Sequence, residues 1–173
     1  MFARSLLILM IALLCPHTAG AGAAADAFAA VKGIWLTEDR DGAVEFYVCG
    51  DNELCGKFAW LKPSPSNAVK ADLDDKNPDP KLRNRQLCGM QFMGGFKPQN
   101  DGRFTGGWIY SPRHGAKFSS SIRTQTRDAI ELRGYMLLPI LGSSQTWTRA
   151  GNDITPCQPR SYDANIAGHP RRG

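Results

Sequence analysis

"AVEFYVCGDNELCGKFAWL", residues 43–61, contains the pattern that decides the fold. Apolar and polar residues alternate on both sides of residues 50–52, which are Gly-Asp-Asn and tolerate the positive φ angles of a tight turn. Successive side chains of a strand point to opposite faces, so the alternation gives each half of the stretch one apolar face. The stretch therefore predicts a β-hairpin with strands at 43–49 and 54–61.

The same alternation recurs from Val31 to Arg149, interrupted by Gly, Asn, Asp and Pro about every ten residues. It predicts eight antiparallel strands, at 31–37, 43–49, 54–61, 87–94, 104–110, 116–123, 128–136 and 144–149. No segment has a sustained helical period, although the Ala-rich N-terminal stretch and residues 63–71 have room for a turn or two of helix.

Eight consecutive strands, each with one apolar face, either close into an up-and-down barrel or split into a two-sheet sandwich. Closure removes the exposed strand edges and suits neighbours that are joined by hairpins, so the barrel is favoured. We expect an all-β chain with one antiparallel barrel domain at residues 26–157, followed by a flexible C-terminal tail at 158–173.

Residues 1–25 have the composition of a secretory signal peptide: Arg4, an apolar run from Leu6 to Leu14, and then small residues. Cleavage after Ala21 or Ala25 fits the small-residue preference at that site. The apolar run is shorter than the roughly 20 residues that span a bilayer. We expect a periplasmic or secreted protein with no transmembrane segment in the mature chain.

The charge is modestly basic, and it does not indicate nucleic-acid binding. The chain has 21 Lys and Arg against 16 Asp and Glu, and loss of Arg4 with the signal peptide leaves 20 against 16. A nucleic-acid interface requires a basic stripe interleaved with aromatic residues on one face. The basic residues here are scattered, so the excess is interpreted as a contribution to solubility.

Four cysteines remain after the signal peptide, and an even number in an exported chain indicates disulfides. Cys49 and Cys55 lie opposite each other on the outward face of the predicted hairpin, so they are in position to form a local disulfide. By elimination, Cys88 pairs with Cys157. No C-x-x-C pair is present to suggest a zinc site, and we expect no metal.

The connection at 62–86 is long and polar, with an acidic run that invites a calcium interpretation. An EF-hand is excluded because Asn77 occupies the position of the loop glycine and Arg83 that of the bidentate glutamate. A solvated loop is the favoured interpretation over a looser cation site, whose oxygen ligands would be Asp72, Asp74, Asp75, Asn77 and Asp79.

No catalytic constellation is apparent, and we expect no enzymatic activity. The chain has no G-x-S-x-G motif, and its serines have no evident base. His114 lies in a hairpin turn and His169 in the tail, while Glu45 and Glu131 fall on outward faces of predicted strands.

Several aromatic residues fall on predicted inward faces, with glycines between them. Such a set can line a cavity for a small apolar ligand, since an eight-stranded barrel has just enough room for one. It can equally fill a packed core, and the sequence leaves both interpretations open. The candidate cavity-lining residues are Phe46, Phe58, Trp60, Phe104, Trp108, Tyr110 and Phe118.

Six motifs in order resemble a family of small secreted bacterial proteins known only as a domain of unknown function. They are "GIW", "YVCGDNELCGK", "DDKNPDPKLRNRQLCG", "GGWIYSPRHGAKF", "ELRGY" and "SQTWTR", and they extend from Gly33 to Arg149. The resemblance implies a lipocalin-like (calycin-like) barrel, and it implies no established activity.

In lipocalins, a G-x-W on the first strand packs against an Arg from the last strand at the closed end of the barrel. Here Gly33, Trp35 and Arg149 match these positions. The contact has a physical basis, because a guanidinium over an indole face contributes about 0.5 to 2 kcal/mol. We therefore expect these three residues to close the barrel.

The expected function is non-catalytic binding of a small apolar ligand, without a cofactor. The alternative is a cell-envelope interaction or structural module with no small-molecule ligand. That module would use residues 62–86 and the basic end of the tail, Arg171 and Arg172, as its contact surface.

Overall fold

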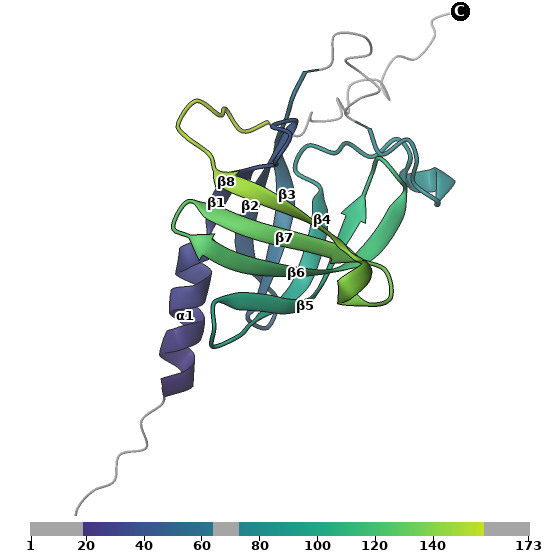
Figure 1. Cartoon of the computed structure of the whole chain (residues 1–173). Helices are drawn as coiled ribbons and strands as arrows, with labels where there is room; N and C mark the ends of the chain where they lie inside the picture. The colour runs from purple at the N-terminus through teal and green to yellow at the C-terminus, as the bar shows by residue number, and fades with distance from the viewer. Residues whose placement is uncertain (1–18, 64–72, 158–173) are drawn as a thin grey trace, which may run out of the picture.

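The computed structural model of the chain describes residues 19–63 and 73–157. Helix α1 (Ala19–Val31) precedes eight strands that form one closed antiparallel barrel in sequence order (Figure 1). The predicted eight-stranded up-and-down barrel is confirmed, and the sandwich alternative is excluded by the closure. The strands are β1 (Gly33–Leu36), β2 (Gly42–Cys49), β3 (Glu53–Leu61), β4 (Gln91–Pro98), β5 (Arg103–Ser111), β6 (Ala116–Thr126), β7 (Ala129–Tyr135) and β8 (Ser143–Arg149).

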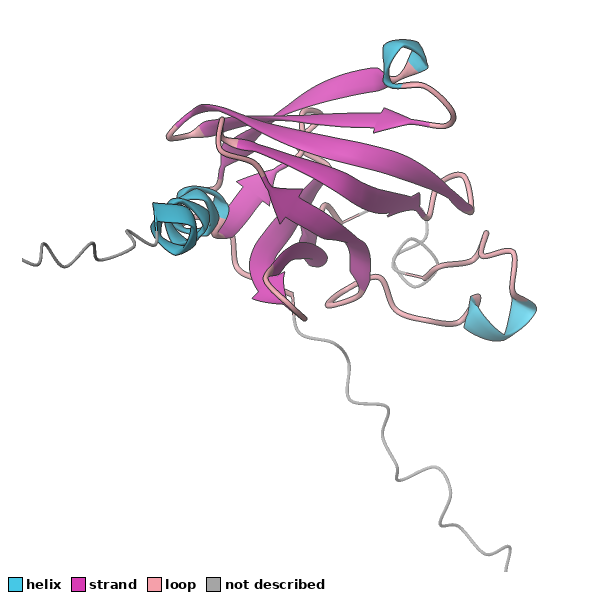
Figure 2. Ribbon diagram, turned by 90° about the horizontal axis from the view of Figure 1, so that it is seen from below, coloured by secondary structure: helices cyan, strands magenta, loops and turns pink. Residues whose placement is uncertain are grey.

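Closure depends on a short seam between β1 and β8. Trp35 pairs with Arg149 and Leu36 with Thr148, and the backbone N–H of Ala150 donates to the carbonyl of Ile34 at 2.9 Å. The remaining neighbours pair over longer stretches, and each pair is antiparallel. Two short 3₁₀ helices, η1 (Pro80–Leu82) and η2 (Pro139–Leu141), lie at the end of the barrel away from α1 (Figure 2).

Helix α1 corrects the N-terminal prediction, because it is 13 residues long and ends at Val31, where a strand was expected to begin. Alanine is the strongest helix former, and this segment is mostly alanine. Phe28 and Val31 are buried, and the Phe28 ring lies 5.7 Å from that of Phe104. The helix therefore covers one end of the barrel. No helix of the described residues is long and apolar enough to cross a membrane.

Most of the predicted signal peptide, residues 1–18, lies outside the described residues, as does the predicted tail at 158–173. Residues 19–25 form the first half of α1, in which Ala24 packs against the core. Both candidate cleavage sites fall within the helix. Neither site would remove Phe28 or Val31, which carry the buried contacts.

Strand β4 begins four residues later than the 87–94 prediction and continues through two glycines to Pro98. A bulge makes this possible. Leu54 pairs with Phe96, and Gly56 pairs with Met93, which leaves Gly94 and Gly95 opposite one residue of β3. Gly95 adopts a φ of 74°, a conformation that suits glycine in a bulge. A Gly-Gly pair here marks a bend within the strand and not its end.

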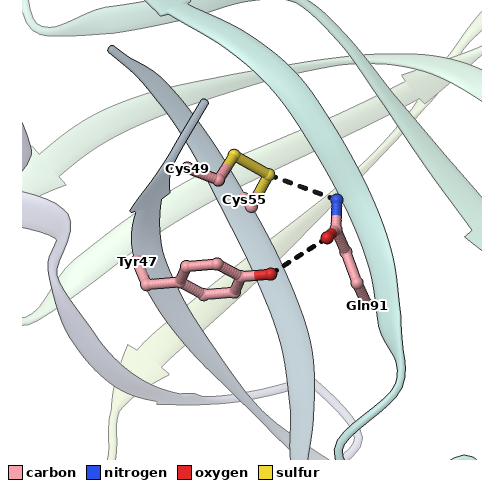
Figure 3. Close-up of a disulfide and its surroundings, with 4 residues drawn as sticks. All are labelled: Tyr47, Cys49, Cys55 and Gln91. Atoms are coloured by element: carbon pink, nitrogen blue, oxygen red, sulfur yellow. Dashed lines mark hydrogen bonds between the residues drawn. A yellow bond between two sulfur atoms is a disulfide. The ribbon is translucent and has the colours of Figure 1, made fainter. Parts of the chain in front are cut away.

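Both predicted disulfides are confirmed, with Cα–Cα distances of 5.8 Å for Cys49–Cys55 and 6.0 Å for Cys88–Cys157. Figure 3 shows the first one on the outer surface of the barrel beside Tyr47 and Gln91. The Gln91 amide donates to Cys55 Sγ at 3.2 Å and accepts from the Tyr47 hydroxyl at 3.0 Å. This network links the β2–β3 hairpin to β4.

Candidate functional site

The barrel interior divides into two halves. The half next to α1 is a packed core, in which the side chains of Trp35, Ile122 and Ile130 are buried. Phe46 and Phe104, two of the candidate cavity-lining residues, belong to this half and are 1% and 0% exposed. Phe46 stacks on Trp147 at 6.1 Å, while Phe104 contacts Phe28 of α1. Phe46 and Phe104 therefore fill a packed core and do not line a cavity.

The other half contains a cavity of about 1040 Å³ that opens at the end opposite α1. Phe58 and Phe118, both predicted to line a cavity, do so. The rings of Phe58 and Phe92 stack at 3.9 Å on one wall. At Gly134 an added Cβ would have no neighbour within 4 Å, so this wall borders open space. The large apolar side chains of the lining are Phe58, Leu61, Leu73, Leu87, Phe92, Ile109, Phe118, Leu132 and Trp147.

The mouth of the cavity is polar. Arg113 forms an ion pair with Asp41 at 3.0 Å, and His114 Nδ1 lies 2.9 Å from the Ser111 hydroxyl. Lys62 and Lys76 also line the mouth, and no ion pair joins either of them to another described residue. The cavity thus combines an apolar interior with a charged entrance, where Lys62, Lys76 and Arg113 outnumber the carboxylates of Asp41 and Asp75.

Residues 73–86 form one wall of the mouth. The buried carboxylate of Asp74 holds this segment in place. Asp74 is fully buried and accepts hydrogen bonds from Tyr110 at 2.7 Å, Asn77 at 2.6 Å and Arg85 at 2.7 Å. Burial raises the pKa of Asp74, but these hydrogen bonds and the Arg85 charge outweigh burial and hold the pKa below its ordinary value. The prediction of a solvated acidic loop is wrong at Asp74 and Asn77, since both side chains are buried. Asp74 fastens the segment to Tyr110 of β5, and Asn77 holds Asp74 from within the segment. Asp72 lies outside the described residues.

Tyr110 lines the cavity and is held in place by a hydrogen bond to Asp74. Its ring borders the cavity, while its hydroxyl donates to Asp74. Burial, together with the neighbouring Asp74 carboxylate, raises the pKa of Tyr110 to about 12. The hydroxyl therefore stays protonated and bonded at neutral pH, and the ring offers the cavity an apolar face.

Trp60 and Trp108 are absent from the lining, and a β-bulge explains each displacement. In β3, Val44 pairs with Phe58 but Ala43 pairs with Trp60, so one extra residue shifts the alternation. Leu61 lines the cavity in place of Trp60.

In β5, the register shifts between Phe104 and Gly107, and Gly106 adopts a φ of 73°. Gly107 then faces the barrel interior. A Cβ added at this position would overlap the ring of Phe96, which is buried in the core. Trp108 points to the outer surface, where Lys117 Nζ lies 4.0 Å from the centre of its ring.

At the closed end, the guanidinium of Arg149 lies 4.2 Å from the centre of the Trp35 ring. It also donates to the carbonyl of Ala30 at 2.8 Å and to that of Lys32 at 3.1 Å. Trp35 in turn donates from Nε1 to the carbonyl of Val31 at 2.8 Å. Sequence reasoning placed Arg149 over Trp35 but missed the helix terminus, whose carbonyl groups the same side chain caps.

Residues 33–149 match the model of a family described as uncharacterized protein conserved in bacteria (DUF2147). A search of curated proteins by sequence gives no significant match. Among solved structures, the barrel is similar to protein HP1028 from Helicobacter pylori, described as belonging to the lipocalin family. The TM-score is 0.60 at 23% identity, over 70% of this chain and 84% of that one. The fold is therefore lipocalin-like, and the chain belongs to the DUF2147 family of uncharacterized bacterial proteins.

Proposed function

We propose that this protein binds a small, largely apolar molecule in the open half of the barrel and does so without catalysis. The cavity of about 1040 Å³ carries this proposal, because ligand sites for small molecules typically occupy roughly 300 to 1,000 Å³ and are lined mainly by apolar side chains. Its interior offers aromatic and aliphatic surface, and its polar groups gather at the mouth.

The distribution of polar groups supports a ligand with an apolar body and a polar or anionic end. An apolar body fits against Phe58, Phe118 and Leu132. A polar end at the mouth lies near Lys62 and Lys76, whose charges favour an anionic group over a cationic one. Such an orientation leaves the ligand's polar end hydrated, so its desolvation cost is avoided.

A periplasmic or extracellular location is part of the proposal. The two disulfides support it, because disulfides persist mainly in oxidising compartments. The predicted signal peptide supports it from the sequence. In such a compartment, a soluble barrel with an apolar cavity is suited to carrying a molecule of low water solubility.

Gly134→Leu tests this function by filling the cavity. The position borders open space and has no positive φ, so the added side chain enters the cavity without backbone strain. Thr148→Leu is the matched control, since it adds a similar side chain on the exposed, outward face of β8. Unfolding by urea checks that both variants keep the fold.

The measurement is a fluorescence titration with N-phenyl-1-naphthylamine, a neutral apolar probe. We expect the wild type to bind one molecule per chain, Gly134→Leu to bind at least tenfold more weakly, and Thr148→Leu to stay within twofold of the wild type. Absence of binding to the wild type, or equal binding by Gly134→Leu, contradicts the proposal. An envelope interaction or structural module needs no cavity and predicts that absence.

A further inference from the structure

The connection between β7 and β8 displays a run of large apolar side chains to solvent. Residues 136–141, "MLLPIL", are here called the apolar loop. Elsewhere in the described residues, the exposed large apolar side chains are Val48 at 46% and Leu82 at 38%. The side chains of the loop are exposed at 75% for Met136, 86% for Leu137, 56% for Leu138, 82% for Ile140 and 75% for Leu141.

The backbone of the apolar loop is held by hydrogen bonds although its side chains are mostly exposed to solvent. Its η2 turn is closed by the N–H of Leu141, which donates to the carbonyl of Leu138 at 3.0 Å. The carbonyl of Pro139 accepts from the N–H of Gly142 at 3.1 Å and from Arg133 Nε at 2.7 Å. A tight turn of this kind presents its side chains in several directions, as a wedge and not as a flat face.

The apolar loop stands beside the mouth of the cavity. Gly134 and Ser143, which flank it in sequence, both line the cavity. Figures 1 and 2 show η2 beyond the ends of β7 and β8, at the end of the barrel opposite α1. A surface that received the loop would therefore also face the cavity mouth.

The charge around the loop and the mouth is positive. Arg133 lies at the base of the loop, where the Ser144 hydroxyl links it to the Glu131 carboxylate, and Lys62, Lys76 and Arg113 lie at the mouth. The carboxylates that line the mouth are Asp41 and Asp75, and Asp41 is paired with Arg113. Cations beside an apolar wedge match the headgroups and the acyl boundary of an anionic bilayer.

We propose that the apolar loop inserts into the interface of an anionic lipid bilayer, with the cavity mouth turned toward the membrane. A bilayer accepts a wedge of side chains without shape complementarity, whereas a protein partner would need a pocket that fits this turn. The docking rests on the loop and the charges. A second consequence, direct passage of an apolar ligand between bilayer and cavity, rests on the proposed function.

Flotation with vesicles of 70% phosphatidylcholine and 30% phosphatidylglycerol tests the docking. The variant is the double substitution Leu137→Ser and Ile140→Ser, which removes apolar surface that packs against nothing else. Val48→Ser is the matched control, because it removes an exposed apolar side chain from β2, near the closed end of the barrel. Urea midpoints equal to that of the wild type show that both variants keep the fold.

We expect the wild type to bind the vesicles, the double variant to bind at least tenfold more weakly, and Val48→Ser to stay within twofold of the wild type. Vesicles of phosphatidylcholine alone should bind the wild type several-fold more weakly, because the cations then have no anionic lipid. Failure of the wild type to bind, or equal binding by the double variant, overturns the proposal. Equal binding to neutral vesicles overturns the role of the cations.

Titration with N-phenyl-1-naphthylamine in the absence of vesicles distinguishes docking from a lid. The double variant should bind the probe as the wild type does. If it loses the probe and the wild type does not bind vesicles, the loop covers the cavity and the docking proposal is wrong. Gly134→Leu separates the two proposals, because it should lose the probe and still bind vesicles.

Discussion

Replacing Arg149 by alanine removes one side chain that connects three segments at the closed end of the barrel. Its guanidinium stacks on Trp35, caps the carbonyl groups of Ala30 and Lys32 at the end of α1, and donates to the carbonyl of Arg127 at 3.0 Å in the β6–β7 turn. The side chain is 29% exposed, so most of its surface lies against the protein, although its hydrogen bonds to the carbonyl groups lie at the surface. The substitution therefore removes the side-chain contacts that β8 makes with the end of α1, with Trp35 of β1 and with the β6–β7 turn, while the backbone pairing of β1 with β8 remains.

The expected loss of stability is about 3 kcal/mol. The cation–π contact contributes about 1 kcal/mol at this depth. The three carbonyl acceptors contribute about 0.5 to 1 kcal/mol each, because water replaces part of the lost hydrogen bonding. The ion pair with Asp128, whose side chain is 71% exposed, adds little. The expected loss of stability is therefore larger than the loss of the cation–π contact with Trp35 would cause alone.

Urea unfolding followed by tryptophan fluorescence measures this loss as a shift of the midpoint at constant m-value. Arg149→Lys keeps the charge but not the planar fork, and it should lose about half as much stability. Arg123→Ala removes an exposed arginine on β6 and should change stability by less than about 0.5 kcal/mol. The reasoning is refuted if Arg149→Ala is no less stable than Arg123→Ala.

Two further predictions concern the cross-links and the buried carboxylate. Replacing both cysteines of the Cys88–Cys157 disulfide by alanine should lower stability by about 4 kcal/mol, against about 2 kcal/mol for the Cys49–Cys55 disulfide, because the longer loop loses more chain entropy. Equal losses in urea unfolding would speak against that ranking. The lowered pKa of Asp74 stabilises the fold above the ordinary carboxyl pKa of 3.8, and this stabilisation is lost as pH falls through the folded pKa. The stability gap between the wild type and Asp74→Asn should therefore narrow below about pH 4; a gap that stays constant down to pH 2.5 would count against the buried network.

The strands could be predicted because the alternation from Val44 to Trp147 is regular and its turns contain Gly, Asn and Asp. Helix α1 could not, since its alanines also fit the end of a signal peptide. Residues 19–25 satisfy both descriptions, whereas the burial of Phe28 and Val31 shows that the second half of the helix belongs to the fold.

Within the site, Phe58 and Phe118 follow from the alternation, whereas Trp60 and Trp108 fail because each lies just after a bulge. One extra residue reverses the face of every residue beyond it until the register is restored. Gly106 was a usable signal, since a glycine inside a strand often marks a bulge. Beside Trp60 no such residue occurs, because the extra residue there is Ala59.

Native mass spectrometry of the protein isolated from its own cells tests the binding function most directly. We expect that the wild type carries one bound small molecule per chain, and that Gly134→Leu, isolated in the same way, carries none. A wild type without bound mass, or the same bound mass on both proteins, would contradict the assignment of the cavity as a ligand site.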